Sequence, residues 1–443
     1  MAELPAFEPK SPFETAFRTA IEGADAYRAV RAGLRLHDDI LRIGNRFVSV
    51  DRFREIGFVA LGNAAGSMAL AAQEMLGERL TQGLTAGAVA TPDTLQFQHM
   101  EVPDPWPGSA PSESARASAL ELAGGLNAGD LLLVLLSPGA FSVAAGPPSG
   151  WEAAEWRRLL QRVAAASGPV AAVRVARVLG TGAVGGRLAA AVSEALVVTL
   201  VVDRGEGPEW VGGGPTIPLR PEEPAAVRSL LSGTGVENFR DPGLVVGRNV
   251  YRPVVVTGPA DAVEAAGNLL AGQGWISRLL SLHLQGSPEE VAAQFVQGME
   301  TIRRDQVAAP IRSRAGAEEP GAGTPLPSIP VPSTATPQAR PESRGLAVFG
   351  ATTFGTVEGG ERADDVRAFL RAAAGQSIRR EAYVGALRTA GGVPGRGDAA
   401  GNWLGHRASG DLSAEPVIES FAVRAGFTDV GTLLVGFVPW VAR

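Results

Sequence analysis

The amino-acid sequence predicts an α/β fold with mainly parallel sheets in three layers. Three short runs are almost wholly apolar, at 57–61 (GFVAL), 131–136 (LLLVLL) and 196–202 (LVVTLVV). Strands of a parallel sheet have this composition because helices cover both of their faces. Stretches with the period of amphipathic helices separate these runs, so strands and helices alternate along the chain. The length of 443 residues allows two or three domains.

The first half of the chain contains several expected helices, at 16–34, at about 66–77 and at 151–166. The second of these follows the 57–61 strand after the turn 62–66 (GNAAG), which makes a strand–turn–helix unit.

A second series of elements begins near residue 250. Ser287 and Pro288 are typical of a helix start, since serine caps the first amides and proline fits the first turn. The segment 313–344 is rich in proline, serine and glycine, which indicates a flexible linker. The expected elements are strands at 251–256, 382–388 and 432–438, two strands around a turn within 346–357, and helices at 260–273, 287–304 and 362–374.

These elements divide the chain into five segments. We expect a tail at 1–14, an N-terminal α/β domain at 15–240, a connecting strand–helix segment at 241–312, the linker at 313–344 and a C-terminal α/β domain at 345–443.

The basic residues exclude several classes of enzyme. Of 40 lysines and arginines, Lys10 is the one lysine, and it precedes the predicted domains. Walker-type phosphate loops, Schiff-base enzymes and kinases that need lysine on their phosphates are therefore excluded. A GC-rich genome explains much of this bias, but arginine cannot replace the compact charge of a lysine that does chemistry.

The remaining composition predicts a cytoplasmic protein. The formal net charge is −6 without a basic stripe, so nucleic acid is not an expected partner. No apolar run reaches about 18 residues, so no membrane span is expected. The acidic start MAELPAFEPKSPFET lacks the apolar core of a secretory signal, and the chain has no cysteine. Because the chain has no cysteine, disulfides and thiolate metal sites are excluded.

Glycine-rich turns after the predicted strands are the clearest motifs of the chain. They are Gly62-Asn63-Ala64-Ala65, Ser137-Pro138-Gly139-Ala140-Phe141-Ser142 and Gly185-Gly186-Arg187-Leu188-Ala189. In this order, with V-P-D at 102–104 and G-P-T at 214–216, the chain resembles the glycerate 2-kinase family, the class II glycerate kinases with a leucine-rich C-terminal domain. The resemblance runs from about residue 15 to the C-terminus. It implies two domains with a cleft between them, and transfer of the γ-phosphoryl group of ATP to glycerate with a divalent metal such as Mg²⁺.

The resemblance also implies candidate site residues. The catalytic positions are Asn63, where the family has the lysine of G-K-A-A, and Arg362, which is retained from G-G-R-N-Q-E. Asp203 and Glu206 are the implied metal ligands, the second matched only with a gap. The implied substrate and phosphate contacts are Ser137, Arg177, Gly185, Gly186, Arg187 and Asp398.

Several positions depart from the family motifs. Val184 replaces the lysine of K-G-G-R-L-A, Pro138 and Phe141 enter the glycine loop, and Asp398 remains of three C-terminal aspartates. Phosphoryl transfer depends almost entirely on positioning and electrostatics. We therefore expect catalysis to be weak or lost.

Three interpretations remain open. Arg177, Arg187 and Arg362 could take over the role of the lysine in a working kinase. The chain could instead be a non-catalytic homologue that binds a small anionic metabolite or partners an active kinase, as a homodimer or a mixed complex. It could also be a structural or assembly protein, with side chains such as Phe141 and Trp210 filling the cleft. For the motif around Arg187, a tight turn at Gly185 and Gly186 with a surface ion pair of Arg187 is an equally weighted alternative to binding of a carboxylate or phosphate.

Overall fold

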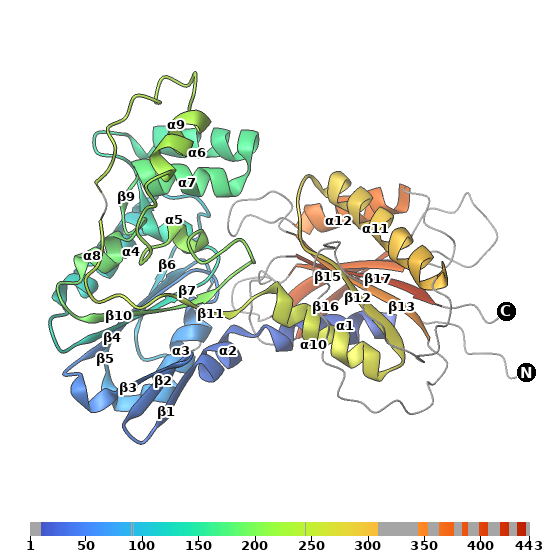
Figure 1. Ribbon diagram of the computed structural model, residues 1–443, viewed down its shortest axis with the longest axis horizontal. Coiled ribbons are helices and arrows are strands. Elements are labelled where there is room, and N and C mark those ends of the chain that lie inside the picture. Colours follow the sequence, from blue (N-terminus) through green and yellow to red (C-terminus); the bar gives the residue numbers. More distant parts are fainter. Residues whose placement is uncertain are drawn as a thin grey trace, which may run out of the picture.

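The computed structural model describes residues 10–89, 91, 93–243, 245–308, 344–352, 363–375, 383–388, 398–405, 417–424 and 432–439. These residues form two α/β domains that lie side by side (Figure 1). Within them, no helix is both long enough and apolar enough to cross a membrane.

The first domain is built on a six-stranded parallel sheet in the order β11–β10–β7–β4–β5–β6. The three apolar runs form adjacent strands in it, and every residue of the first two of these strands is buried. The α/β class and these strands are thus confirmed. The strands are β4 (Ile56–Leu61), β5 (Leu80–Gly87), β6 (Gln98–Glu101), β7 (Leu131–Leu136), β10 (Leu196–Val202) and β11 (Val254–Thr257).

Helices cover both faces of this sheet, which gives the predicted three layers. Leu131, Leu133 and Leu135 of β7 pack with α2 (Ala26–Gly33) and α3 (Ala65–Leu76), whereas the alternate residues face the other core. That core contains α4 (Ala110–Gly125), α5 (Ala140–Ala144), α6 (Ala153–Ser167), α7 (Pro169–Leu179), α8 (Arg187–Ala191) and α9 (Glu223–Leu230). The smaller elements are an antiparallel meander of β1 (Leu34–His37), β2 (Ile40–Ile43) and β3 (Arg46–Ser49), and a hairpin of β8 (Ala145–Gly146) and β9 (Thr181–Gly182).

The second domain contains another six-stranded sheet, in the order β12–β13–β17–β14–β15–β16. Among its described strands, β12 and β13 are parallel and the other neighbours are antiparallel, so this sheet differs from the mainly parallel arrangement that we expected for both domains. Antiparallel neighbours need no crossover helix. The strands are β12 (Trp275–Leu284), β13 (Gly345–Thr352), β14 (Tyr383–Arg388), β15 (Asp398–Gly405), β16 (Val417–Arg424) and β17 (Thr432–Pro439).

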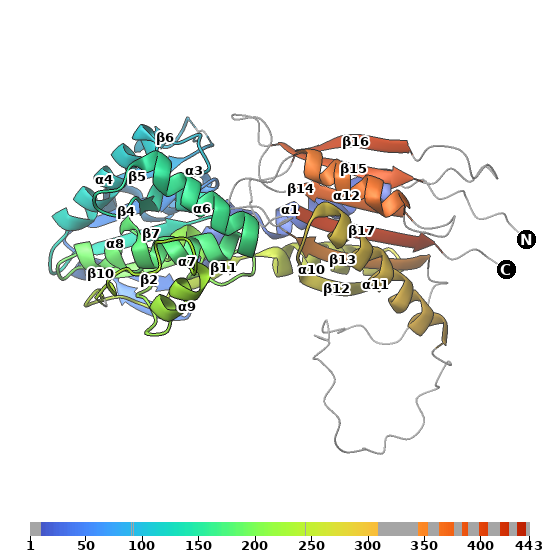
Figure 2. The same cartoon turned by 90° about the horizontal axis from the view of Figure 1, so that it is seen from above.

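Two pairs of helices cover the two faces of the second sheet, one pair above and one below it in Figure 1; Figure 2 shows the same domain from above. Helices α1 (Lys10–Gly23) and α10 (Pro259–Gly272) contribute to the core on one face. Helices α11 (Pro288–Ala308) and α12 (Ala363–Gly375) form a separate core on the other.

The domain boundaries differ from those expected from the sequence. Phe13 of α1 is fully buried, and its ring centroid lies 4.8 Å from that of Phe437 in β17. Helix α1 therefore belongs to the second domain, and it overlaps the end of the predicted tail at 1–14. The predicted connector 241–312 is divided, because β11 completes the first sheet whereas α10, β12 and α11 build the second domain. Nearly all of the predicted linker lies outside the described residues.

Two predicted elements are also corrected. The helix expected at 16–34 is interrupted where Asp25 accepts a hydrogen bond from Arg28 N–H at 2.8 Å and caps α2. This break lets α1 pack in one domain and α2 in the other. Two strands around a turn were expected within 346–357, but residues 346–352 belong to one continuous strand, β13. The residues from 353 to 357 lie outside the described part.

Candidate functional site

Two turns at the carboxyl ends of neighbouring strands form the centre of the candidate site. Strands β4 and β7 are adjacent and parallel, so the turns that follow them lie side by side. Ser137 N–H donates a hydrogen bond to Leu61 O at 3.0 Å, and Asn63 N–H donates to Pro138 O at 2.8 Å. The structure thus brings Asn63 and Ser137 together.

The two turns pack so closely that neither has room for a side chain at its glycine. A Cβ atom at Gly62 would lie 2.2 Å from Ser137 O, and one at Gly139 would lie 2.7 Å from Oδ1 of Asn63. The buried Ser137 hydroxyl accepts a hydrogen bond from Ala64 N–H at 2.9 Å, at the start of α3. These groups therefore stabilise the neighbouring turn and the start of a helix, which are structural roles.

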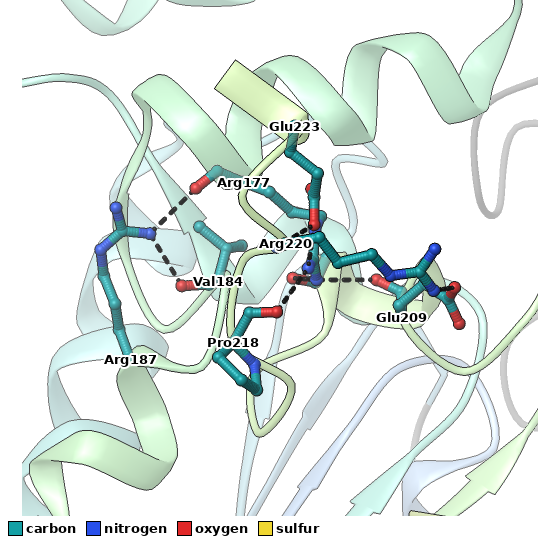
Figure 3. Close-up of polar contacts among 8 residues, drawn as sticks. Arg177, Val184, Arg187, Glu209, Pro218, Arg220 and Glu223 are labelled. Carbon is teal, nitrogen blue, oxygen red and sulfur yellow. Dashed lines mark hydrogen bonds and ion pairs between the residues drawn. The ribbon is translucent and has the colours of Figure 1, made fainter. Parts of the chain in front are cut away.

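Arg177 uses all of its hydrogen-bond donors inside the first domain (Figure 3). Its side chain is fully buried, and Nε and Nη2 form a bidentate pair with Glu223, each at 2.9 Å. Nη1 donates to Glu209 O and Gly213 O, both at 3.0 Å, and Nη2 also donates to Pro218 O at 3.2 Å. A guanidinium has five N–H groups, so none remains for a phosphate in this arrangement. Arg177 therefore fits a structural role better than the implied ligand contact.

The ion pair between Arg177 and Glu223 also determines the charge of the carboxyl group. Burial alone would raise the pKa of Glu223. The hydrogen bonds and positive charge of Arg177, with smaller contributions from the amide and charge of Arg220, outweigh this effect and hold the pKa below its ordinary value. Glu223 is therefore ionised at neutral pH, as its bidentate pairing requires.

The glycine pair at 185–186 binds the same loop that Arg177 holds. Gly185 N–H donates to Gly213 O at 2.9 Å, and Gly186 N–H donates to Gly214 O at 3.0 Å. Both glycines have positive φ angles, +62° and +85°, which favour glycine. Val184, which stands at the second family lysine position, is fully buried beside them. This motif therefore forms a tight turn whose amides already have partners.

Arg187 caps the end of α7 with one part of its guanidinium. Its Nη1 donates to Arg177 O at 3.1 Å and to Val184 O at 2.8 Å (Figure 3). Burial, and to a lesser degree the nearby charge of Arg177, lower the pKa of Arg187. A cation at a helix C-terminus interacts favourably with the helix dipole. No surface ion pair with an acid is found for Arg187 within the described residues.

The candidate metal ligands lie where the two domains meet. Asp203 follows β10 and accepts a hydrogen bond from Gly207 N–H at 3.1 Å, so its carboxylate holds its own turn. Burial raises the pKa of both Asp203 and Glu206. His283 of β12 packs onto this turn, because a Cβ atom at Gly205 would lie 2.2 Å from its Cε1.

The space between the domains at this point is small. A cavity of about 20 Å³ is lined by Arg204 and Glu206 from the first domain and by residues 282–285 and 351–352 from the second. Its volume is that of about one water molecule. Across the described part of the chain, no group of three or more acidic or histidine side chains is placed to hold a metal ion. Mg²⁺ is usually bound by one or two carboxylates together with waters and substrate phosphates, so a role of Asp203 and Glu206 as its ligands stays a prediction.

Two candidate residues cannot be assessed from side-chain contacts. Arg362 lies outside the described residues. Asp398 opens β15 opposite Arg424 of β16, and its side chain is outside the described part as well. A role for either residue therefore stays a prediction.

The side chains that were expected to fill a cleft lie within the first domain. Phe141 is fully buried in its core, and Trp210 is partly buried under the guanidiniums of Arg174 and Arg177, at 5.0 and 5.5 Å. Neither aromatic residue lines the small cavity between the domains.

Sequence reasoning missed two residues that shape the site. Glu223 lies in the first turn of α9, and its sequence context, PEEP, gives no signal for a partner 46 residues away. His283 is an isolated histidine in a strand, and only the docking of the domains places it on the turn after β10.

Comparison with known proteins gives relatives for both sequence and structure. The domain of unknown function DUF4147 matches residues 13–242. A glycerate kinase of Danio rerio is 27% identical over 318 residues, which cover 63% of this chain and 62% of that protein. The chain thus spans less than two thirds of that relative's length.

Two solved structures share the fold over nearly the whole chain. A glycerate kinase of Thermotoga maritima matches with a TM-score of 0.65 and 18% identity, covering 97% of this chain and 99% of that one. A protein of Pyrococcus horikoshii matches with a TM-score of 0.65 and 15% identity, covering 99% and 100%. At these identities the likeness establishes the fold.

Proposed function

Because the chain belongs to the glycerate 2-kinase family, whose DUF4147 domain it carries, we propose that it is a glycerate kinase-like protein in which phosphoryl transfer from ATP is weak or lost. One observation carries the proposal: both family lysine positions are replaced, and the buried arginine of the same site, Arg177, uses all of its donors inside the protein. Asn63 and Val184 stand at those positions. Arg177, a fully buried residue of α7, donates all five N–H groups to protein acceptors.

The size of the expected loss follows from the electrostatics of phosphoryl transfer. Removal of one preorganised donor from an active site typically costs about 2.7–4 kcal/mol, or two to three decades in rate. Two lysine positions are replaced here, and effects of groups that act together are not additive. Even one such loss would reduce a kinase with a typical turnover of about 1–100 per second to a marginal rate.

The test is turnover by the purified full chain. ADP release is measured with ATP, glycerate and Mg²⁺, and we expect a rate no higher than that without glycerate. Asn63→Lys is expected to restore little, because Val184 still occupies the second lysine position. Glycerate-dependent turnover above about 1 per second would overturn the proposal. To be assigned to this protein, such turnover must be lost in Arg362→Met and retained in Arg35→Met, the control at an exposed position of β1.

A second candidate function is that of a non-catalytic metabolite-binding or regulatory homologue. A cavity of about 500 Å³ in the first domain favours it. On this view the chain binds a small anionic metabolite, and it forms a homodimer or a complex with an active homologue in the cytoplasm. Thermal stabilisation by a metabolite without ADP release, or co-purification of an active kinase, would support this function. Absence of both would contradict it.

A further inference from the structure

A cavity of about 500 Å³ opens in the first domain, away from the turns after β4 and β7. Its walls come from the end of α7, the β9 side of the β8–β9 hairpin, the segment 148–151 and the loop 236–242. All of its lining residues belong to the first domain. Small-molecule sites are typically clefts of about 300–1,000 Å³, so the volume suits a metabolite.

The charged residues in the wall of this cavity are both arginines. Arg187 and Arg240 line it, and no acidic residue does so. A third arginine, Arg116, lies directly behind the hairpin, where a Cβ atom at Gly182 would lie 2.3 Å from its Cδ. The charged side chains that line the cavity are therefore all positive, which favours an anion.

Arg187 has donors that the protein leaves unused. Its Nη1 caps α7, but its Nε and Nη2 donate to no described protein atom. The nearby charge that acts on it is that of Arg177, which is repulsive and, with burial, lowers its pKa. A partly buried cation without a counter-ion costs free energy. An anion in the cavity would supply the missing partner, and a guanidinium binds carboxylate or phosphate through two parallel hydrogen bonds.

Two aromatic side chains form the apolar part of the wall. Trp151 lines the cavity and is held edge-on by Trp156, with ring centroids 6.2 Å apart and planes at 87°. Phe239 also lines it and lies under the guanidinium of Arg228, at 4.8 Å. Large aromatic surfaces that are already fixed bind a ring or an apolar chain with little loss of entropy.

We propose that this cavity binds a small organic anion. Arg187 and Arg240 pair with its carboxylate or phosphate group, and Trp151 and Phe239 contact its ring or apolar part. The site lies away from the turns after β4 and β7 but shares Arg187 with the implied phosphate contacts, so the proposal deepens the second candidate function, that of a metabolite-binding homologue. It does not depend on the proposed loss of catalysis, because binding and ADP release are measured independently.

Phenyl phosphate is a suitable probe, since it combines one anionic group with one ring. Calorimetric titration of the full chain is expected to show saturable binding. Inorganic phosphate lacks the ring and benzyl alcohol lacks the charge, so both are expected to bind at least tenfold more weakly. Hydrogen exchange is expected to slow in residues 178–182 and 236–242 when phenyl phosphate is added.

Two variants separate binding from helix capping. Arg240→Gln changes an exposed side chain and is expected to weaken phenyl phosphate binding at least tenfold without changing the melting temperature. Arg187→Gln is expected to weaken binding and also to lower the melting temperature, because it removes the cap of α7. Arg35→Gln, at an exposed position of β1, is the matched control and is expected to bind like the unmodified chain.

Several results would overturn the proposal. One is the absence of saturable binding, and another is equal affinity in the unmodified chain and in both variants. An Arg187→Gln variant that loses stability but keeps full affinity would show that this residue only caps the helix. Equal binding of inorganic phosphate and phenyl phosphate, or no protection at 178–182 and 236–242, would also refute the organic-anion site.

Discussion

Replacement of Arg177, whose guanidinium makes five hydrogen bonds, gives the sharpest test of its structural role. Arg177→Met keeps the unbranched apolar part of the side chain but removes the guanidinium and its five hydrogen bonds. It leaves the Glu223 carboxylate, which is 4% exposed, without its counter-ion. Loss of one partner of a buried ion pair typically costs about 3–5 kcal/mol. For a domain of this size, such a loss corresponds to a fall of roughly 10 °C in melting temperature.

The pH dependence of Arg177→Met adds an independent check. In the unmodified chain Arg177 holds the pKa of Glu223 below its ordinary value, so this pair stabilises the fold above that ordinary value. The stabilisation is lost as the pH falls through the depressed pKa, because the carboxyl group is then protonated. The difference in stability between the unmodified chain and Arg177→Met should therefore be smaller in acid than at pH 7.

Urea denaturation followed by circular dichroism measures these effects. The double variant Arg177→Met/Glu223→Leu removes both charges and should be less destabilised than Arg177→Met, because the remaining cost is unpaired backbone carbonyls. Arg35→Met is the control, since Arg35 is exposed. A loss below about 1 kcal/mol in Arg177→Met, within the usual range of surface pairs, would refute the reasoning, as would a double variant that is less stable than the single one.

Three further variants test other contacts of the site. Ser137→Ala removes the acceptor for an amide at the start of α3 and should cost about 0.5–2 kcal/mol in denaturant titration; an unchanged midpoint would contradict this role. Glu206→Gln should raise the melting temperature more at pH 8 than at pH 5. Burial raises the pKa of Glu206, so ionisation of this carboxyl group above its ordinary pKa of about 4.5 destabilises the fold. Equal shifts in melting temperature at both pH values would contradict this prediction. Gly205→Ala should lower the melting temperature more than Gly129→Ala, because the φ angles are similar (+91° and +85°) but only the first substitution meets His283; equal losses would mean that the domains do not touch there.

The elements that could be predicted are those whose own residues indicate their structure, whichever elements they pack against. Strands β7 and β10 begin and end as expected, because their apolar runs reflect burial on both faces and nothing else. The second sheet was harder, since antiparallel strands with one pattern of burial can pair in several orders. Helix α1 shows the limit most clearly. Its apolar face has the right period, but only the folded chain shows that it packs against a sheet formed mainly by residues beyond 345.

The candidate site was predictable in its placement and not in its contacts. That Asn63 and Ser137 lie together follows from their positions after adjacent parallel strands, because carboxyl ends of parallel strands meet at one edge of the sheet. The partners of Arg177 could not be predicted, since all five of its hydrogen bonds depend on a loop at 209–218 and on the start of α9. A bidentate pair between residues 46 positions apart leaves no periodic signal.

The backbone hydrogen bonds of the glycine pair determine whether the family motif G-G-R, retained at 185–187, is evidence for activity. The amides of Gly185 and Gly186 bind carbonyl groups of Gly213 and Gly214, and their φ angles require little or no side chain. These requirements persist whether or not a phosphate ever approaches the turn, because an unbonded buried amide costs free energy in either case. The same holds for Arg187, whose Nη1 caps α7. Retention of this motif is therefore evidence for the fold. Evidence for catalysis has to come from positions whose side chains have no such structural role. The two family lysine positions are of this kind, and this chain has Asn63 and Val184 there.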